Sequence, residues 1–136
     1  MSIKNFTLPT ALYQHILQHA QNSDGLEVCG LLAEDQSGVC SVYRIPNISE
    51  EPKNSFYMDP SAQIAALRTM RQESEQLCGI YHSHPRSEAI PSDRDQRMAA
   101  YPGTAYLIVS LLQTEPEMKA YLFDGDQFQP LNLVIR

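Results

Sequence analysis

Apolar residues recur along the chain with the spacing of amphipathic helices in two places, and a third helix is predicted after them. A first helix is predicted over roughly 9–21, where an apolar residue recurs at every fourth position: Leu8, Leu12, Ile16 and Ala20. Asp59 and Pro60 begin a second predicted helix, which runs to about Gln76, because proline is favoured in the first turn. Ser92 begins a third, short one that ends near Tyr101.

Short apolar, β-prone segments separate these helices. Val28–Glu34 and Val39–Ile45 are joined by four turn-forming residues and predict a hairpin. Further strands are predicted for four apolar segments: Leu77–His82, Thr104–Leu112, Met118–Phe123 and Phe128–Ile135. Polar, proline-containing loops are predicted over 46–54 and 85–91. Helices mixed with hairpin-connected strands indicate an α/β fold, with a mixed sheet flanked by helices.

Length and charge limit the class of protein. A chain of 136 residues predicts a single domain over 1–136, with a hydrophobic core large enough to fold without disulfides. The net charge is −6, and the arginines Arg86, Arg94 and Arg97 alternate with acidic residues. Without a basic stripe to neutralise phosphates, we expect neither nucleic acid nor an anionic membrane as a partner.

Cysteine usage and hydropathy indicate the compartment. Cys29, Cys40 and Cys78 form an odd set without a CxxC spacing, which is typical of reduced, buried thiols. The first ten residues have no apolar run of the length that a signal peptide needs, and the longest apolar stretches are strand-sized. We therefore expect a cytoplasmic protein without a membrane span.

A His-x-His pair lies at the end of the predicted strand 77–82. His82 and His84 face the same side of an extended chain, so both imidazoles can point at one metal ion. A short loop then leads into a helix whose first turn can bring Asp95 round as a third ligand. Three protein ligands with an open fourth position are typical of catalytic zinc, which activates a bound water.

Other interpretations apply to parts of this pattern. His-x-His pairs occur by chance, and Ser92-x-x-Asp95 fits a helix capping box, which does not exclude metal binding. His15 and His19 have the spacing of a zincin helix, but Ile16 stands where the catalytic glutamate is required, so we expect helix-surface histidines. A zinc deaminase would need His-x-Glu and Pro-Cys-x-x-Cys, and neither is present.

A metal-dependent hydrolase also needs a general base. Glu27 is the best candidate, because it stands immediately before the apolar strand 28–34. Sequence spacing does not place Glu27 beside His82, and an exposed glutamate at this position would be unremarkable.

The set Glu27-Val-Cys-Gly-Leu-Leu32, His82-Ser-His-Pro85 and Pro91-Ser92-x-x-Asp95 resembles the JAMM signature of the MPN+ (Mov34) zinc metalloprotease family. Residues 54–60 and the helix after them also resemble that family's middle section, so the resemblance covers nearly the whole chain. It implies the cytidine-deaminase-like MPN fold, with three layers. No signature position departs from the pattern.

The resemblance also implies roles for these residues. His82, His84 and Asp95 would bind Zn²⁺, Glu27 would act as general base and then as acid, and Ser92 would stabilise the oxyanion. The substrates implied are amide or isopeptide bonds after the C-terminal Gly-Gly of a ubiquitin-like protein. The short chain resembles the compact prokaryotic members, which are associated with sulfur carriers of the ThiS/MoaD type. A non-catalytic MPN interaction module and a general zinc peptidase are the alternatives.

Overall fold

One mixed sheet forms the centre of the structure, a computed structural model that describes residues 4–136. Its strands are β1 (Asn5–Leu8), β2 (Cys29–Asp35), β3 (Gly38–Ile45), β4 (Gln76–His84), β5 (Ala105–Ser110), β6 (Glu117–Phe123) and β7 (Phe128–Ile135). They lie in the order β1-β7-β6-β5-β4-β2-β3. The β1–β7 and β4–β5 pairs are parallel and the other neighbours are antiparallel, so the predicted mixed sheet is confirmed.

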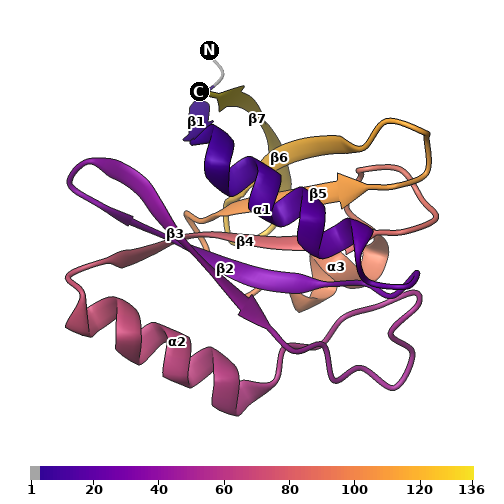
Figure 1. Cartoon of the computed structure of the whole chain (residues 1–136), viewed down its shortest axis with the longest axis horizontal. Helices are drawn as coiled ribbons and strands as arrows, with labels where there is room; N and C mark the ends of the chain where they lie inside the picture. Colours follow the sequence, from indigo (N-terminus) through magenta and orange to yellow (C-terminus); the bar gives the residue numbers. More distant parts are fainter. Residues whose placement is uncertain (1–3) are drawn as a thin grey trace.

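Helices cover both faces of the sheet (Figure 1). The helices are α1 (Thr10–Gln21), α2 (Pro60–Gln72) and α3 (Asp93–Met98). On one face α1 buries Ile16 and Ala20 in a core with Leu32 and Leu107. On the other, α2 packs Ala66 and Met70 into a second core, which the segment after α3 completes. Burial of apolar side chains on both faces produces the expected three-layer α/β arrangement.

Local sequence explains how several of these elements begin and turn. Asp35 accepts hydrogen bonds from the backbone and hydroxyl of Ser37, and Gly38 has a φ of +116°, so the β2–β3 hairpin reverses there as predicted. Asp59 accepts from the backbone N–H of Ser61 and Pro60 occupies the first turn, which starts α2 where the sequence predicts.

Several elements differ from those predicted, and three of the differences bear on the fold and the site. The strand β1 was not expected, because its pairing partner β7 lies at the other end of the chain and only tertiary structure joins them. The second helix ends at Gln72 rather than near Gln76, and Ser74 takes a φ of +58° in the turn that follows. The strand β4 continues through His84 instead of ending at His82.

The extension of β4 decides where the histidines lie. In the sheet, β4 is flanked by β2 and β5, and His82 is paired with Cys29 on one side and Ile108 on the other. Both histidines therefore lie on a central strand, near its carboxyl end. Within residues 4–136, no helix combines the length and the apolar character that crossing a membrane would require.

Candidate active site

Two histidines and an aspartate converge at the carboxyl end of β4. His82 and His84 are two residues apart on an extended strand, so both side chains leave the same face of the sheet. The first turn of α3 brings Asp95 over that face. Oδ2 of Asp95 lies 3.0 Å from Nε2 of His82 and 3.1 Å from Nε2 of His84, and the two Nε2 atoms are 3.0 Å apart. The predicted triad is therefore brought together in space.

A capping box holds Asp95 in this position. Ser92 Oγ accepts a hydrogen bond from the backbone N–H of Asp95 at 3.0 Å, and the N–H of Ser92 donates to Asp95 Oδ2 at 2.9 Å. The same carboxylate oxygen faces both imidazoles. The helix-cap interpretation of Ser92-x-x-Asp95 is confirmed, and the same geometry is compatible with a ligand role, because the cap orients the carboxylate toward the histidines.

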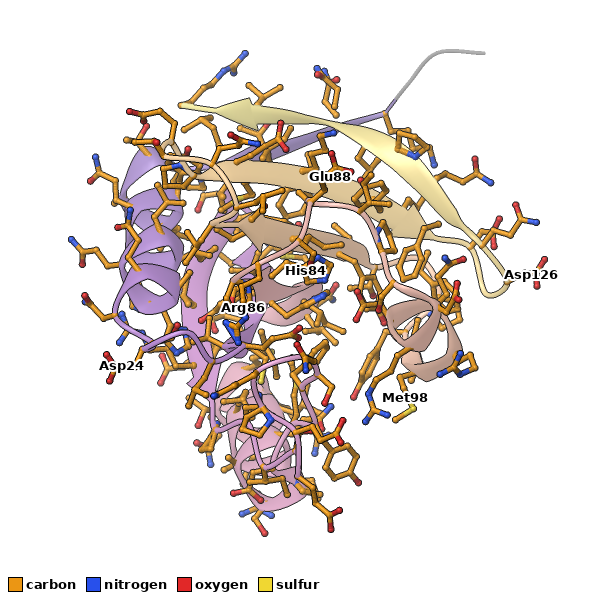
Figure 2. The ribbon with its side chains drawn as sticks, turned by 90° about the vertical axis from the view of Figure 1, so that its right-hand side faces the viewer. Asp24, His84, Arg86, Glu88, Met98 and Asp126 are labelled. Carbon is orange, nitrogen blue, oxygen red and sulfur yellow. The ribbon has the colours of Figure 1, made fainter. Side chains whose placement is uncertain are left out.

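The loop after β4 orients His84. Nδ1 of His84 lies 2.7 Å from the carbonyl oxygen of Glu88. A carbonyl can only accept, so this contact places the proton on Nδ1 and leaves Nε2 free to act as a ligand. Ser110 donates to the carbonyl of Ser87 and Tyr121 donates to that of Ala89, so β5 and β6 hold the loop on both sides of Glu88. In Figure 2, Glu88 and Arg86 lie on this loop beside His84.

An aromatic ring orients His82 instead of a hydrogen bond. Phe56, from the loop before α2, stacks on His82 with ring centroids 4.5 Å apart and an interplanar angle of 27°. Nδ1 of His82 is buried and has no hydrogen-bond partner among the described residues. Metal-binding histidines are usually oriented by a hydrogen bond that the second ring nitrogen donates. Since Nδ1 of His82 makes no such bond within residues 4–136, stacking on Phe56 is what restrains this ring.

The donor set fits a divalent cation. Two imidazole nitrogens and one carboxylate oxygen are within 4.8 Å of one another, and His82 and His84 are only 2% and 4% exposed. In the protein alone, burial lowers the pKa of His82, which favours its neutral, ligating form. Burial opposes ionisation of Asp95, but its contacts with the two histidines and with the backbone N–H of Ser92 outweigh this and hold the pKa of the carboxyl well below its usual range. These residues can hold a metal ion.

Glu27 lies beside this cluster, as the function of a base requires. Cys29 of β2 is paired with His82 of β4, and one residue further along the N–H of Ser83 donates to the carbonyl oxygen of Val28 at 3.0 Å. Because the two segments run antiparallel, the next residues along them, Glu27 and His84, lie side by side. Asn47 donates to the carbonyl oxygen of Glu27 at 2.9 Å, and the N–H of Glu27 donates to Pro52 O at 2.7 Å. The backbone of Glu27 is therefore fixed from both sides.

The environment of Glu27 makes it an effective proton acceptor near neutral pH. Its side chain is buried, with 6% of the residue exposed, and Oε1 has no hydrogen-bond partner among the described residues. Burial, opposed by the nearby His84, raises the pKa of this carboxyl to about 7. A carboxylate whose pKa lies close to the working pH is suited to both accept and return a proton.

Three supporting residues were missed from the sequence. Phe56, Ser83 and Glu88 contact or fix the cluster, yet none carries chemistry that distinguishes it in a sequence. A weak indication of a role for Ser83 was present in the sequence. It stands between two histidines of one strand, so its side chain must point to the opposite face of the sheet. The Glu88 contact uses only a backbone carbonyl, which no side-chain pattern can indicate.

The surface assignment of His15 and His19 needs a correction. His19 is half-buried, and its Nδ1 lies 2.7 Å from the hydroxyl of Tyr81, whose ring is fully buried beneath α1. His15 is partly exposed and accepts a hydrogen bond from Arg44 Nε at 2.9 Å. His19 therefore belongs to the contact between α1 and the sheet, because it follows the buried Ile16 by three residues and so lies on the same side of the helix.

A three-layer mixed α/β fold with two histidines on a central strand and an aspartate at a helix start defines a JAB/MPN-type domain. The chain belongs to the prokaryotic homologs of the JAB domain, a family that matches residues 9–124. It is 31% identical to the desampylase of Haloferax volcanii over 127 residues, covering 92% of this chain and 89% of that protein. It is 32% identical to the CysO-cysteine peptidase of Mycobacterium tuberculosis, covering 90% of this chain and 87% of the relative.

Solved structures agree with this assignment. A protein from Desulfitobacterium hafniense, solved in solution, superposes with a TM-score of 0.84 at 33% identity, over 96% of this chain and 92% of that one. A JAB1/MPN domain protein from Archaeoglobus fulgidus superposes with a TM-score of 0.61 at 20% identity, over 98% of each chain. The second likeness concerns the fold alone. The MPN fold expected from the sequence is confirmed.

Proposed function

We propose that this protein is a zinc-dependent metallopeptidase that hydrolyses the amide bond after the C-terminal Gly-Gly of a ubiquitin-like or sulfur-carrier protein. The observation that carries the proposal is the convergence of His82 Nε2, His84 Nε2 and Asp95 Oδ2 beside the buried carboxylate of Glu27, whose Oε1 has no hydrogen-bond partner within residues 4–136. Metal-assisted hydrolysis requires protein ligands that leave one position on the metal open, and a general base beside that position.

The names of the relatives support the reaction class and the kind of substrate. The family includes proteins named desampylase and CysO-cysteine peptidase, which are hydrolases of conjugates by name. This chain is a JAMM-type hydrolase of that family. Its substrate, by the same relationship, is the conjugate of a small ubiquitin-like carrier protein.

In the proposed mechanism each polar side chain of the site has its own role. When bound by His82, His84 and Asp95, zinc supplies a Lewis acid for the scissile carbonyl and activates water. Glu27 accepts a proton from the attacking water as the new C–O bond forms. It then donates that proton to the amide nitrogen as the C–N bond breaks, so that the amine leaves neutral.

In this proposal Ser92 stabilises the charge that develops on the carbonyl oxygen. Its Oγ already accepts a hydrogen bond from Asp95 N–H, and this contact uses a lone pair and not the hydroxyl hydrogen. The hydrogen stays available for donation to a substrate oxygen. Ser92 can therefore cap α3 and act as an oxyanion donor at the same time.

Two alternatives make different predictions. A non-catalytic interaction module would not need a buried glutamate without a partner beside three metal ligands, because an unpaired buried carboxylate is costly to keep. A general zinc peptidase would use the same site but would not require a Gly-Gly carrier. The first alternative predicts no hydrolysis, and the second predicts equal hydrolysis of unrelated peptides.

The whole chain, residues 1–136, is proposed to act as one catalytic domain in the cytoplasm. The continuous sheet from β1 to β7 supports a single domain, since both ends of the chain pair within it. The cysteines Cys29, Cys40 and Cys78 are free thiols, which supports a reducing compartment.

The test combines metal content with cleavage. Purified wild type and a His82→Ala/His84→Ala variant are measured by elemental analysis, and both are assayed on a sulfur carrier whose Gly-Gly is extended by a short peptide. About one zinc per wild-type chain, lost in the variant together with cleavage after Gly-Gly, supports the proposal. Wild type that takes up no zinc and cleaves nothing contradicts it, and equal cleavage of an unrelated peptide favours the general peptidase.

A further inference from the structure

An apolar pocket of about 330 Å³ opens beside the metal-ligand cluster. Its floor is formed by β4, β5 and β7, and its walls by the start of α2 and the end of α3. Most of the lining is aromatic or aliphatic, including Phe56, Met58, Tyr101, Tyr106, Ile108 and Phe128. Tyr57 and Met98 also line it and are 45% and 51% exposed, so the pocket is open to solvent at one side.

The pocket is continuous with one half of the candidate active site. His82 and Asp95 belong to its lining, whereas Glu27 and His84 do not. The strand order explains this separation: the pocket extends from β4 over β5 toward β7, while Glu27 stands before β2, on the other side of β4. The base and the pocket therefore lie on opposite sides of His82.

This separation assigns the pocket to one half of the substrate. Glu27 has to reach the attacking water and then the amide nitrogen, so the departing amine lies on the Glu27 side. The acyl chain leaves the carbonyl carbon in the other direction, toward the pocket. Two glycines have no side chain, and they span about 7 Å when extended. The first side chain available for the pocket is that of the residue before Gly-Gly.

The pocket is already formed, and hydrogen bonds tie several of its polar groups to one another or to the backbone. Gln63 of α2 donates to the Tyr101 hydroxyl at 2.7 Å and so joins its two walls. The Tyr106 hydroxyl accepts from the backbone N–H groups of Ala100 and Tyr101, each at 3.2 Å. Asp95 is the charged residue of the lining, and its carboxylate is directed at the two histidines. An acidic side chain entering here would lose water and would face the negative charge of Asp95.

We propose that this pocket is a specificity site for a large apolar side chain, such as leucine or phenylalanine, at the position immediately before the Gly-Gly of the carrier. The inference rests on the proposed function, because it takes the acyl half of the substrate to be a Gly-Gly tail. It adds a sequence requirement to that tail. Carriers with an apolar residue there are good substrates, and carriers with an acidic residue are poor ones.

The test varies the carrier and leaves the enzyme unchanged. Zinc-loaded wild type is assayed on one sulfur carrier, extended by a peptide after Gly-Gly, with Leu, Ala or Asp before the Gly-Gly. We expect kcat/KM to be about tenfold or more higher for Leu than for Asp, with Ala between them, as for other apolar specificity contacts. A spread of less than twofold overturns the inference and leaves the proposed function standing. Cleavage of none of the three carriers overturns both.

A pocket-filling substitution then locates the preference. Ala99 lines the pocket and is partly buried, so Ala99→Phe is expected to reduce the Leu-to-Asp ratio at least fivefold without changing zinc content. The matched control is Ala65→Phe, which places the same side chain on an exposed position of α2 outside the pocket and is expected to keep the wild-type ratio. Equal ratios in both variants and wild type would overturn the assignment to this pocket.

Discussion

Val28 donates its backbone N–H to the hydroxyl oxygen of Ser83 at 2.9 Å, and the N–H of Ser83 donates to the carbonyl of Val28 at 3.0 Å. Ser83 stands between the two histidines, and Val28 follows Glu27. The pair therefore connects the predicted base to the predicted metal ligands, even though the two segments are far apart in the sequence. Ser83 is fully buried, so this connection is shielded from water.

Removing this connection should impair catalysis and stability together. Ser83→Ala leaves the buried N–H of Val28 without its side-chain partner, which is expected to cost about 1–3 kcal/mol in the free energy of unfolding. One of the contacts that hold the backbone beside Glu27 is removed, so kcat should fall while zinc stays bound. Urea denaturation, zinc analysis and a cleavage assay measure the three effects. The control is Ser61→Ala on the exposed surface of α2, and an equal effect in both variants would contradict the prediction.

Glu27→Gln tests the base without altering the size of the side chain. The amide cannot accept a proton, so hydrolysis is expected to fall by about 10²–10⁴-fold while zinc content stays at the wild-type level. The variant should also gain stability above neutral pH, because the buried carboxylate no longer has to ionise. Metal analysis and initial rates on a Gly-Gly carrier measure the result. Full activity would remove Glu27 from the mechanism.

Ser92→Ala separates an oxyanion role from a helix-cap role. Loss of the hydroxyl donor should lower kcat by about 10²–10³-fold, and loss of the cap should lower stability by about 1 kcal/mol. Ser92→Thr is the control, since it keeps a hydroxyl for both purposes and should retain zinc and most activity. If Ser92→Ala loses its zinc instead, the serine acts through the orientation of Asp95 and not on the substrate.

Phe56→Ala tests the stacking contact that orients His82. With Nδ1 of His82 unpartnered among the described residues, loss of the ring should free the imidazole to rotate. The affinity for zinc is expected to fall about 10–100-fold, the range for loss of a group that orients a metal ligand. Competition with a chromogenic chelator measures it. Tyr57→Ala, at the neighbouring exposed residue, should bind zinc as wild type does, and equal affinities in the two variants would argue against the role of Phe56.

The contact between His19 and Tyr81 predicts a pH dependence of folding. Burial, together with Arg44 and His15, lowers the pKa of His19 to about 4, from 6.5. The unfolded chain therefore binds a proton more readily, and stability is retained above pH 6.5 and lost as the pH falls toward 4. For a half-buried ring the loss is on the order of 1–2 kcal/mol, after allowance for solvent screening.

Urea denaturation at several pH values measures this loss. His19→Gln should show a shallower decline than wild type between pH 6.5 and 4. Both proteins keep His82, His84 and Asp95, so the difference between them reports on His19. Parallel curves would show that His19 does not contribute to the acid sensitivity.

The sequence by itself determined the parts of this protein that depend on local spacing. The helix starts at Pro60 and Ser92, the β2–β3 hairpin and the same-face placement of His82 and His84 all follow from short-range rules of backbone geometry. The Ser92-x-x-Asp95 spacing likewise sets the capping box that turns the carboxylate inward. The position of Glu27 before an apolar strand made it the best candidate base, but no local rule could place it beside the histidines, and its role came from the family resemblance.

Only the tertiary structure decided the rest, because the contacts involved join distant segments of the chain. The pairing of β2 with β4 brings Glu27 to His84, and β1 exists because β7 lies beside it. Phe56 reaches His82 through the loop before α2, and His19 reaches Tyr81 through the packing of α1 on the sheet. Burial then sets the pKa of Glu27, since desolvation depends on which residues surround a group and not on its neighbours in sequence.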